Sequence, residues 1–265
     1  MRPRIPVLTR SLPVLVLLVL VLLVLAVPRP AQAETINCTA ITIVPFTITA
    51  AGVYCLIQDI GTNLPSGAAI TIAANNVVLD LNGHRLDNLA AGRGTQAFGI
   101  SSLHQTNFTI KNGTVSGFFY GINLGDFSPY TTSQGHVIED LRADQNTYLA
   151  ILVAGRGNIV RNTRVVATGG STALGANVAA YGIVVDGPET RILNNDVIGT
   201  FGTGTGASVG IIIHDLGSDS LAVNNRITRA QYGIIYFNGT GKFRDNLTSG
   251  VTYPFGGGTN AGNNN

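Results

Sequence analysis

One pattern of apolar and polar residues returns along the chain between about residues 70 and 250. Each copy opens on Gly-Ile, continues with β-branched residues, passes through a turn, and reaches Asn or Asp before another β-branched pair. The stretch AYGIVVDGPETRILNNDVIG (180–199) shows the pattern, and residues 208–228 and 231–250 repeat it. Alternation with a period of two is typical of strands, and no segment after residue 33 keeps a helical period.

The repeat predicts a solenoid. The distance from each opening to the following Asn or Asp varies less than the distance back to the next opening, so insertions collect in the returning connection. We therefore predict an all-β, single-stranded parallel β-helix of about 7–8 coils, with the openings in one column. These openings are Gly99, Gly121, Ala150, Gly182, Gly210 and Gly233.

An Asn or Asp follows the short apolar pair in each copy. At a bend between strands, such a side chain bonds to neighbouring backbone amides, and repetition on every coil makes a structural ladder. The predicted ladder residues are Asp80, Asn112, Asp140, Asn162, Asn195, Asn225 and Asp245.

The repeats resemble those of the pectin-lyase-like superfamily of right-handed parallel β-helices. ITIAANNVVLDLNGHRLDN (70–88) is similar to the first regular coil of exported bacterial members, and residues 41–60 are similar to the segment that precedes it. The resemblance implies a right-handed solenoid over residues 70–250 and makes His84 a structural turn residue. It says much less about activity.

The ends of the chain differ from the repeats. Residues 1–33 combine an arginine-rich start, an apolar run and Ala-Gln-Ala, which predicts a cleaved signal peptide and a secreted or periplasmic protein. Residues 34–69 are expected to form an N-terminal cap tied by a Cys38–Cys55 disulfide, because two cysteines in an exported chain usually pair. Residues 251–265 are rich in Gly and Asn and predict a tail outside the coils.

Charge argues against nucleic acid as a partner. The chain carries 16 basic and 14 acidic residues, and removing the four arginines before residue 34 leaves 12 against 14. Phosphate binding needs clustered Lys and Arg, which are absent from the sequence after the leader. No membrane association is expected after cleavage, and the sequence does not determine the oligomeric state.

Polar side chains just beyond the Gly-Ile strands are the candidate functional residues. They are Asp126, Arg156, Asp186, His214 and Asp215. If they share one outward edge, they could act together on a polysaccharide lying along the helix axis. Arg156 and His214 would suit a lyase acting on an acidic sugar, and Asp186 with Asp215 would suit a hydrolase.

Two less demanding interpretations stay open. Asp and Asn after a strand are ordinary turn residues, so the chain could be a non-catalytic β-helix that binds glycans or serves as a surface scaffold. No cofactor is expected: Ca²⁺ at Asp126 and Asp186 would have too few oxygen ligands, and no other metal site is predicted. The repeats also resemble periplasmic β-helix proteins of copper maturation, but no Met- or His-rich stretch supports that role.

Known enzyme signatures are missing. The Asn-Thr-Asp and Gly-His-Gly elements of polygalacturonases are absent, and so is the Trp-Ile-Asp-His element of pectate lyases, since the chain has no Trp. IIIHDLG shares only His-Asp with the Asp-Pro-His-Asp element of alginate epimerases. The sequence therefore leaves open whether the protein is an enzyme.

Overall fold

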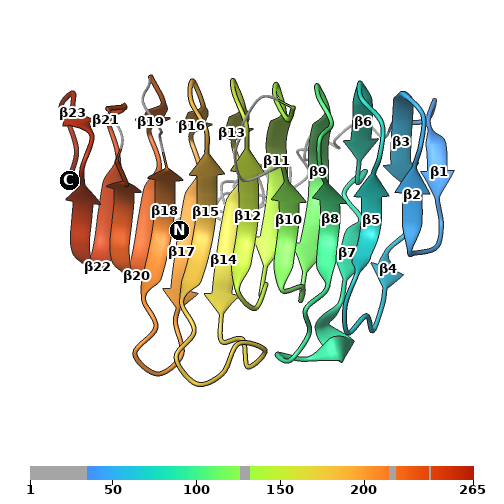
Figure 1. Ribbon diagram of the computed structural model, residues 1–265, viewed down its shortest axis with the longest axis horizontal. Helices are drawn as coiled ribbons and strands as arrows, with labels where there is room; N and C mark the ends of the chain where they lie inside the picture. Colours follow the sequence, from blue (N-terminus) through green and yellow to red (C-terminus); the bar gives the residue numbers. More distant parts are fainter. Residues whose placement is uncertain (1–34, 126–131, 215–218, 239) are drawn as a thin grey trace, which may run out of the picture. The chain divides into compact units, whose positions relative to one another are not determined.

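The computed structural model describes residues 35–125, 132–214, 219–238 and 240–265. Every pairing between named strands in this part is parallel, and the only helical element described is the short 3₁₀ turn η2 (Leu89–Ala91). No helix among these residues is long and apolar enough to cross a membrane. The protein is an all-β parallel β-helix, as the repeat predicts (Figure 1). The predicted signal peptide lies outside the described residues.

The strands stack in three sheets that run along the helix. The first sheet contains β2 (Phe46–Ile48), β5 (Ala68–Ile72), β8 (Phe98–Ser102), β10 (Tyr120–Leu124), β12 (Leu149–Ala154), β15 (Ala180–Asp186), β18 (Ser208–His214) and the later parts of β20 (Arg226–Tyr236) and β22 (Leu247–Gly256). The second contains β1 (Thr39–Ile41), β3 (Gly52–Leu56), β6 (Val77–Asp80), the first parts of β9 (Thr109–Ser116) and β11 (Val137–Asp144), β13 (Ile159–Arg161), β16 (Arg191–Leu193), β19 (Leu221–Val223), β21 (Lys242–Arg244) and β23 (Thr259–Asn260). The third contains β4 (Ile60–Gly61), β7 (Arg85–Asp87), the later parts of β9 and β11, β14 (Arg164–Gly169), β17 (Asp196–Phe201) and the first parts of β20 and β22.

The glycine openings form the predicted column in the first sheet. Tyr120 pairs with Phe98 and Ile122 with Ile100, which places Gly121 against Gly99, and the later registers continue the column. A Cβ on Gly99 would lie 2.5 Å from the carbonyl oxygen of Gly121, so no side chain fits between the coils there. These glycines do not have positive φ angles, so close approach of the coils, and not a turn, requires them.

Apolar side chains fill the space between the three sheets. The residue after each opening points inward and is fully buried, so that like residues stack from coil to coil. This column consists of Ile70, Ile100, Ile122, Ile151, Ile183, Ile211 and Ile234. Burial of each such side chain contributes about 1.5–3 kcal/mol, which makes this core the main source of stability.

The helix extends further at both ends than the sequence predicts. β1 pairs with β3 and β2 pairs with β5, so residues 35–69, the described part of the predicted cap, supply the first coils, which the Cys38–Cys55 disulfide ties together. At the other end β22 continues to Gly256 and β23 pairs with β21. Backbone pairing thus extends into residues 251–265, the predicted tail, and Phe255 packs against the core.

The predicted Asn and Asp ladder falls into more than one column. Asn112, Asp140, Asn162 and Asp245 share a column in which the backbone has positive φ. In that column the other two members are Asn194 and Asn224, not the predicted Asn195 and Asn225. Asp80 lies one residue earlier, paired with Lys111. In the pairs Asn194-Asn195 and Asn224-Asn225, either asparagine can be aligned with Asn162 by sequence alone. The sequence alignment used the second asparagine of each pair, whereas the strand register uses the first.

Asn195 and Asn225 belong to a buried ladder with Asn246 and Asn264. The side-chain oxygen of Asn225 accepts from the backbone N–H and from the Nδ2 of Asn195, both at 3.0 Å. Asn246 does the same for Asn225, and Asn264 for Asn246. Each Nδ2 also donates to a backbone carbonyl of the preceding coil. The ladder thus satisfies buried polar groups at the bend of each later coil.

The long connections lie along one edge of the helix. Residues 88–97, 170–179 and 202–207 each join the third sheet to the first and extend beyond the short turns around them (Figure 1). These are the connections that return to a Gly-Ile opening, as predicted from the spacing. Loops 170–179 and 202–207 belong to consecutive coils, and two coils with short turns separate them from loop 88–97.

Candidate functional site

The structure brings two of the five candidate catalytic residues together. Asp186 ends β15 and His214 ends β18, and they are paired in register on adjacent coils. Asp186 is only 5% exposed, while His214 is half-buried with its ring 5.6 Å from that of Phe237. Asp126 and Asp215 lie outside the described residues. The buried position of Asp186 limits contact between its side chain and a polymer at the surface.

Arg156 lies on the preceding coil, two residues after Ala154, which pairs with Asp186. It follows β12 in a turn whose backbone pairs with Gln134, and its guanidinium is 3.6 Å from the carboxylate of Glu189. Both side chains are largely exposed, so the ion pair contributes little to stability. Within the described residues no three His, Cys, Asp or Glu side chains gather as a metal site would need.

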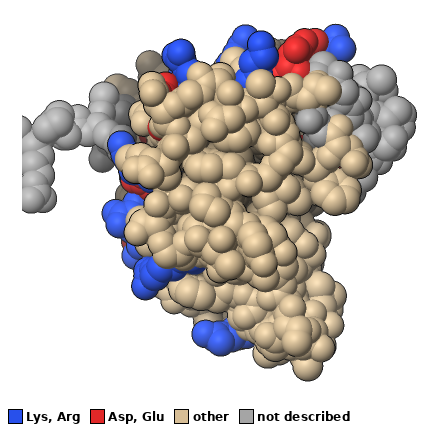
Figure 2. All heavy atoms as spheres, turned by 90° about the vertical axis from the view of Figure 1, so that its left-hand side faces the viewer, with Lys and Arg blue, Asp and Glu red and all other residues tan. Residues whose placement is uncertain are grey.

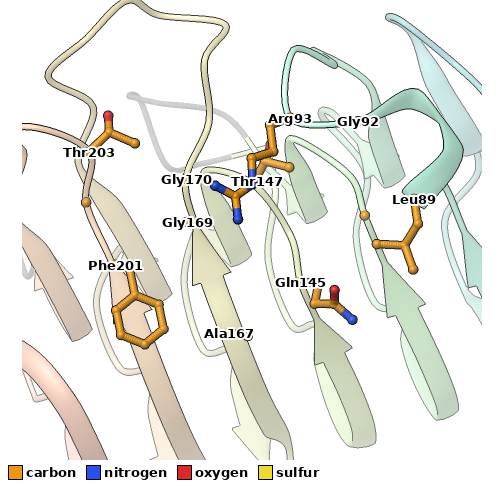
Figure 3. Close-up of a pocket in the computed structure, with 12 residues that line it drawn as sticks. Leu89, Gly92, Arg93, Gln145, Thr147, Ala167, Gly169, Gly170, Phe201 and Thr203 are labelled. Carbon is orange, nitrogen blue, oxygen red and sulfur yellow. The ribbon is translucent and has the colours of Figure 1, made fainter.

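A hollow bounded by described residues lies on the edge with the long loops. It has a volume of about 540 Å³ and is bounded by loop 88–97, the end of β14 and the start of the connection after β17 (Figure 3). We call it the edge groove. It is lined by Leu89, Gly92, Arg93, Gly117, Gln145, Thr147, Ala167, Gly169, Gly170, Phe201, Gly202 and Thr203.

A column of left-handed backbone positions supports the edge groove. Gly117, Gln145, Ala167 and Gly199 lie in register on successive coils, the first two just after β9 and β11 and the last two within β14 and β17. All four have φ between 52° and 75°. Glycine adopts this conformation freely, whereas a residue with a side chain is strained by about 1–2 kcal/mol. Gln145 and Ala167 accept this strain beside the hollow, and the sharp bend directs Gln145 to the exposed surface.

Phe201 supplies an exposed aromatic ring. It is 49% exposed, and its ring lies over Gly199, where an added Cβ would come within 2.8 Å of the ring carbon Cζ. Figure 3 shows Phe201 and Leu89 on opposite sides of the edge groove. A side chain at position 199 would displace the ring. Glycine at this position therefore allows the ring of Phe201 to keep an apolar face exposed to solvent.

Arg93 supplies the positive charge. It is exposed in loop 88–97, and a Cβ on Gly170 would lie 3.1 Å from its Nη1. The carbonyl oxygen of Arg93 accepts a hydrogen bond of 3.0 Å from the N–H of Thr172, so the two long loops meet beside the groove. No hydrogen bond or ion pair joins the guanidinium to another residue in the part of the chain that is described. This leaves its donors directed to solvent or to a ligand.

Thr147 and Gln145 add hydrogen-bonding groups. Thr147 is 5% exposed, and its Oγ1 has no hydrogen-bond partner among the described residues. A buried hydroxyl without a partner costs roughly 1–3 kcal/mol, which a bound polar group or a water would recover. Together with Arg93 and Phe201 these residues offer charge, hydrogen bonds and an apolar face in one place.

The sequence did not indicate the edge groove. Its residues come from connections and from the ends of β14 and β17, where no repeat pattern marks them. The long returning connections were the available signal, since they place extra chain on one edge. Phe201 between Thr200 and Gly202 was a second signal, because a large ring beside a glycine-rich connection has no core position to fill.

No protein-family model, curated protein or solved structure matches this chain. The fold and the edge groove therefore define it only as a parallel β-helix protein with a ligand-sized hollow on its loop edge.

Proposed function

We propose that this chain is an exported β-helix protein that binds an acidic polysaccharide in the edge groove and does not cleave it there. We also propose, on the basis of the sequence repeats, that it belongs to the right-handed, pectin-lyase-like superfamily. The disulfide Cys38–Cys55 supports an oxidising compartment outside the cytoplasm.

The observation that carries this proposal is the combination of Arg93 and Phe201 beside one hollow. A guanidinium binds a carboxylate through two parallel hydrogen bonds. An exposed ring packs against the C–H face of a sugar, while Gln145 and Thr203 can bond to its hydroxyls. The groove crosses several coils, which suits an extended polymer better than a compact metabolite.

The lining residues favour binding over catalysis. None of the twelve residues that line the edge groove is Asp, Glu or His. Glycoside hydrolysis needs two carboxyl groups, and a lyase needs a base near the sugar ring. The lining therefore provides recognition groups without a proton donor or acceptor suited to these reactions.

A second candidate function is supported by the register of Asp186 with His214. These residues lie on adjacent coils, about 5 Å apart along the helix, and could form an acid–base pair for a lyase or hydrolase. Incubation with pectate, alginate and hyaluronan, followed by absorbance of unsaturated uronates and by reducing-end release, tests this. Activity that is lost in Asp186→Asn and retained in Arg93→Ala would favour catalysis at this pair over binding in the groove.

Calorimetric titration with the same three polymers tests the binding proposal. We expect Phe201→Ala to weaken binding about tenfold, because an aromatic contact contributes roughly 0.5–1.5 kcal/mol beyond area burial. Arg93→Ala should weaken binding by a similar factor and reduce the decrease of affinity with salt.

Two exposed residues away from the groove serve as matched controls. Phe237 is 57% exposed near His214, and Arg191 is exposed at the start of β16. Phe237→Ala and Arg191→Ala should leave the affinity unchanged. Equal affinity in Phe201→Ala and the unchanged protein, or a loss confined to Phe237→Ala, would contradict the edge groove as the binding site.

A further inference from the structure

Arg229 lies beside the edge groove without lining it. It is an exposed residue of β20, on the coil that follows the one with Phe201. A Cβ on Gly199 would lie 2.8 Å from Cζ of Phe201 and 3.6 Å from Nη2 of Arg229. The guanidinium therefore reaches back over the preceding coil, to the same glycine that the ring of Phe201 covers.

The backbone of Arg229 has an unfavourable conformation. Its φ is 56°, in the left-handed region that favours glycine. The positions in register with it are Gly199 on the coil before and Gly250 on the coil after, with φ of 73° and 63°. Strained residues cluster where a side chain has a functional task. An arginine between two glycines therefore points to a role for its side chain at the surface.

The guanidinium of Arg229 has no hydrogen bond or ion pair with another described residue. Asp196, on the preceding coil, pairs with Arg226 at 3.0 Å. The last coil has no carboxylate side chain to offer, since residues 246–265 contain no Asp or Glu. Seen from the C-terminal end, the molecule presents mainly uncharged residues, and Lys and Arg lie toward its margin (Figure 2). The donors of Arg229 therefore face solvent or a ligand.

The guanidinium groups of Arg93 and Arg229 lie at different places along the groove. A Cβ on Gly170 would lie 3.1 Å from Nη1 of Arg93, whereas Arg229 lies over Gly199. The register of β14 with β17 places these two glycines one coil and about three residues apart, a distance on the order of 10 Å. A free uronic acid is too short to contact both guanidinium groups, whereas a chain of several sugars can contact both.

We propose that Arg229 binds a second carboxylate of the polysaccharide chain whose first carboxylate binds to Arg93. This role rests on the proposed function, and it narrows the ligand to a linear chain whose carboxylates recur at an interval that matches the two arginines. Phe201 packs against a sugar of this chain beside Arg229. Because both carboxylates belong to one chain, the first contact raises the effective concentration of the second. The site should therefore bind long chains more tightly than short ones.

Arg229→Gly separates a binding role from a structural role. Glycine adopts the φ of this position without strain, so the variant should not lower the urea concentration at which the protein unfolds. Its affinity for six-sugar oligomers should nevertheless fall about fivefold, because one exposed charged contact is lost. Calorimetric titration with oligomers prepared from pectate, alginate and hyaluronan measures this change.

Two-sugar oligomers from the same polymers provide the second measurement. Such an oligomer reaches only one guanidinium, and Arg93 remains in Arg229→Gly, so its affinity should change by no more than about twofold. Competition against a fluorescent six-sugar oligomer measures this weaker binding. A loss that appears only with the longer oligomer is the expected sign of a second contact.

Salt provides a third measurement. Arg93→Ala and Arg229→Gly should each reduce the decrease of affinity with salt, and the double variant should remove it. Arg226→Ala is the matched control, since Arg226 is exposed on the same strand but pairs with Asp196. This control should leave the affinity for both oligomers unchanged.

Three outcomes would overturn the role of Arg229 and keep the proposed function. Arg229→Gly could bind six-sugar oligomers as tightly as the unchanged protein, while Arg93→Ala and Phe201→Ala bind them more weakly. It could lose affinity for both oligomers equally, or Arg226→Ala could show the same loss. The proposed function itself fails if the unchanged protein binds none of the polymers or oligomers.

Discussion

At the scale of single residues, the glycines of the first sheet are explained by close approach and not by backbone conformation. The Cβ of an alanine at 182 would overlap the carbonyl oxygen of Gly210 and press on Val197. Ala150 occupies the same column, so the column accepts a methyl group where the adjacent coil leaves room. The spacing of the coils, and not the residue type alone, determines which positions need glycine.

Gly182→Ala should therefore destabilise the protein. Overpacking of a tight site costs about 1–3 kcal/mol, and a backbone oxygen cannot move as a side chain can. Urea unfolding followed by circular dichroism measures the change. Gly61→Ala is the control, since Gly61 ends a strand and has no atom within 4 Å of its added Cβ. Equal stability of the two variants would contradict this account of the column.

A second residue of interest is His136, which is fully buried. Its ring stacks on Phe108 with 3.8 Å between centroids, and Nε2 lies 2.8 Å from Oγ of Ser133. Nδ1 has no partner among the described residues. Burial lowers the pKa of His136 from 6.5 to about 4, because the charged ring would lose its hydration.

This pKa predicts a loss of stability in mild acid. The unfolded chain binds a proton at His136 below about pH 6.5, whereas the folded protein does so only below about pH 4, so stability falls as the pH drops between these values. From pH 7 to pH 5 the loss is about 2 kcal/mol. His136→Asn should reduce the pH dependence of urea unfolding by that amount. A variant with the same pH dependence as the unchanged protein would show that His136 is not its source.

At the scale of the elements, the buried asparagine ladder holds the later coils in register. Asn195, Asn225 and Asn246 have no exposed surface, and each side chain serves as both donor and acceptor. The repeat predicted Asn195 and Asn225 as ladder residues, but it placed them in one column with Asn112, Asp140, Asn162 and Asp245, which belong to the adjacent column. Burial distinguishes the two columns, because Asn224 is exposed and Asn225 is not.

Asn225→Leu should be strongly destabilising, whereas Asn224→Gly should not. Leucine at 225 would leave the N–H and Nδ2 of Asn195 without their acceptor, and the cost is about 1–3 kcal/mol for each buried group left unpaired. Glycine at 224 keeps the positive φ of that position, 54°. Urea unfolding compares the two variants. A larger loss in Asn224→Gly would mean that the exposed column maintains the register.

At the scale of the whole molecule, the periodic part of the structure was predictable and the site was not. The parallel β-helix and the glycine column follow from side chains that repeat on every coil, which a sequence displays directly. The edge groove depends on Arg93, Gln145 and Phe201, which come from three different coils and occur once. Their proximity depends on loop conformation, for which the spacing of apolar residues carries no information.

The ends illustrate the same limit. Residues 251–265 lack the apolar pattern, yet β22 and β23 continue the helix because the coil before them supplies a template of backbone partners. Composition describes what a segment can bury by itself. It does not describe the backbone hydrogen bonds that the segment can form with a coil that has already folded.

The hydrogen bond from Thr172 to Arg93 should affect how far local unfolding spreads along the helix. In most solenoids a coil interacts only with the coils next to it, so local opening can stay local. Here two loops separated by two intervening coils are joined directly. The coils between them cannot separate without breaking that link, so this middle block should open as one cooperative unit during hydrogen exchange, including the positions that line the groove.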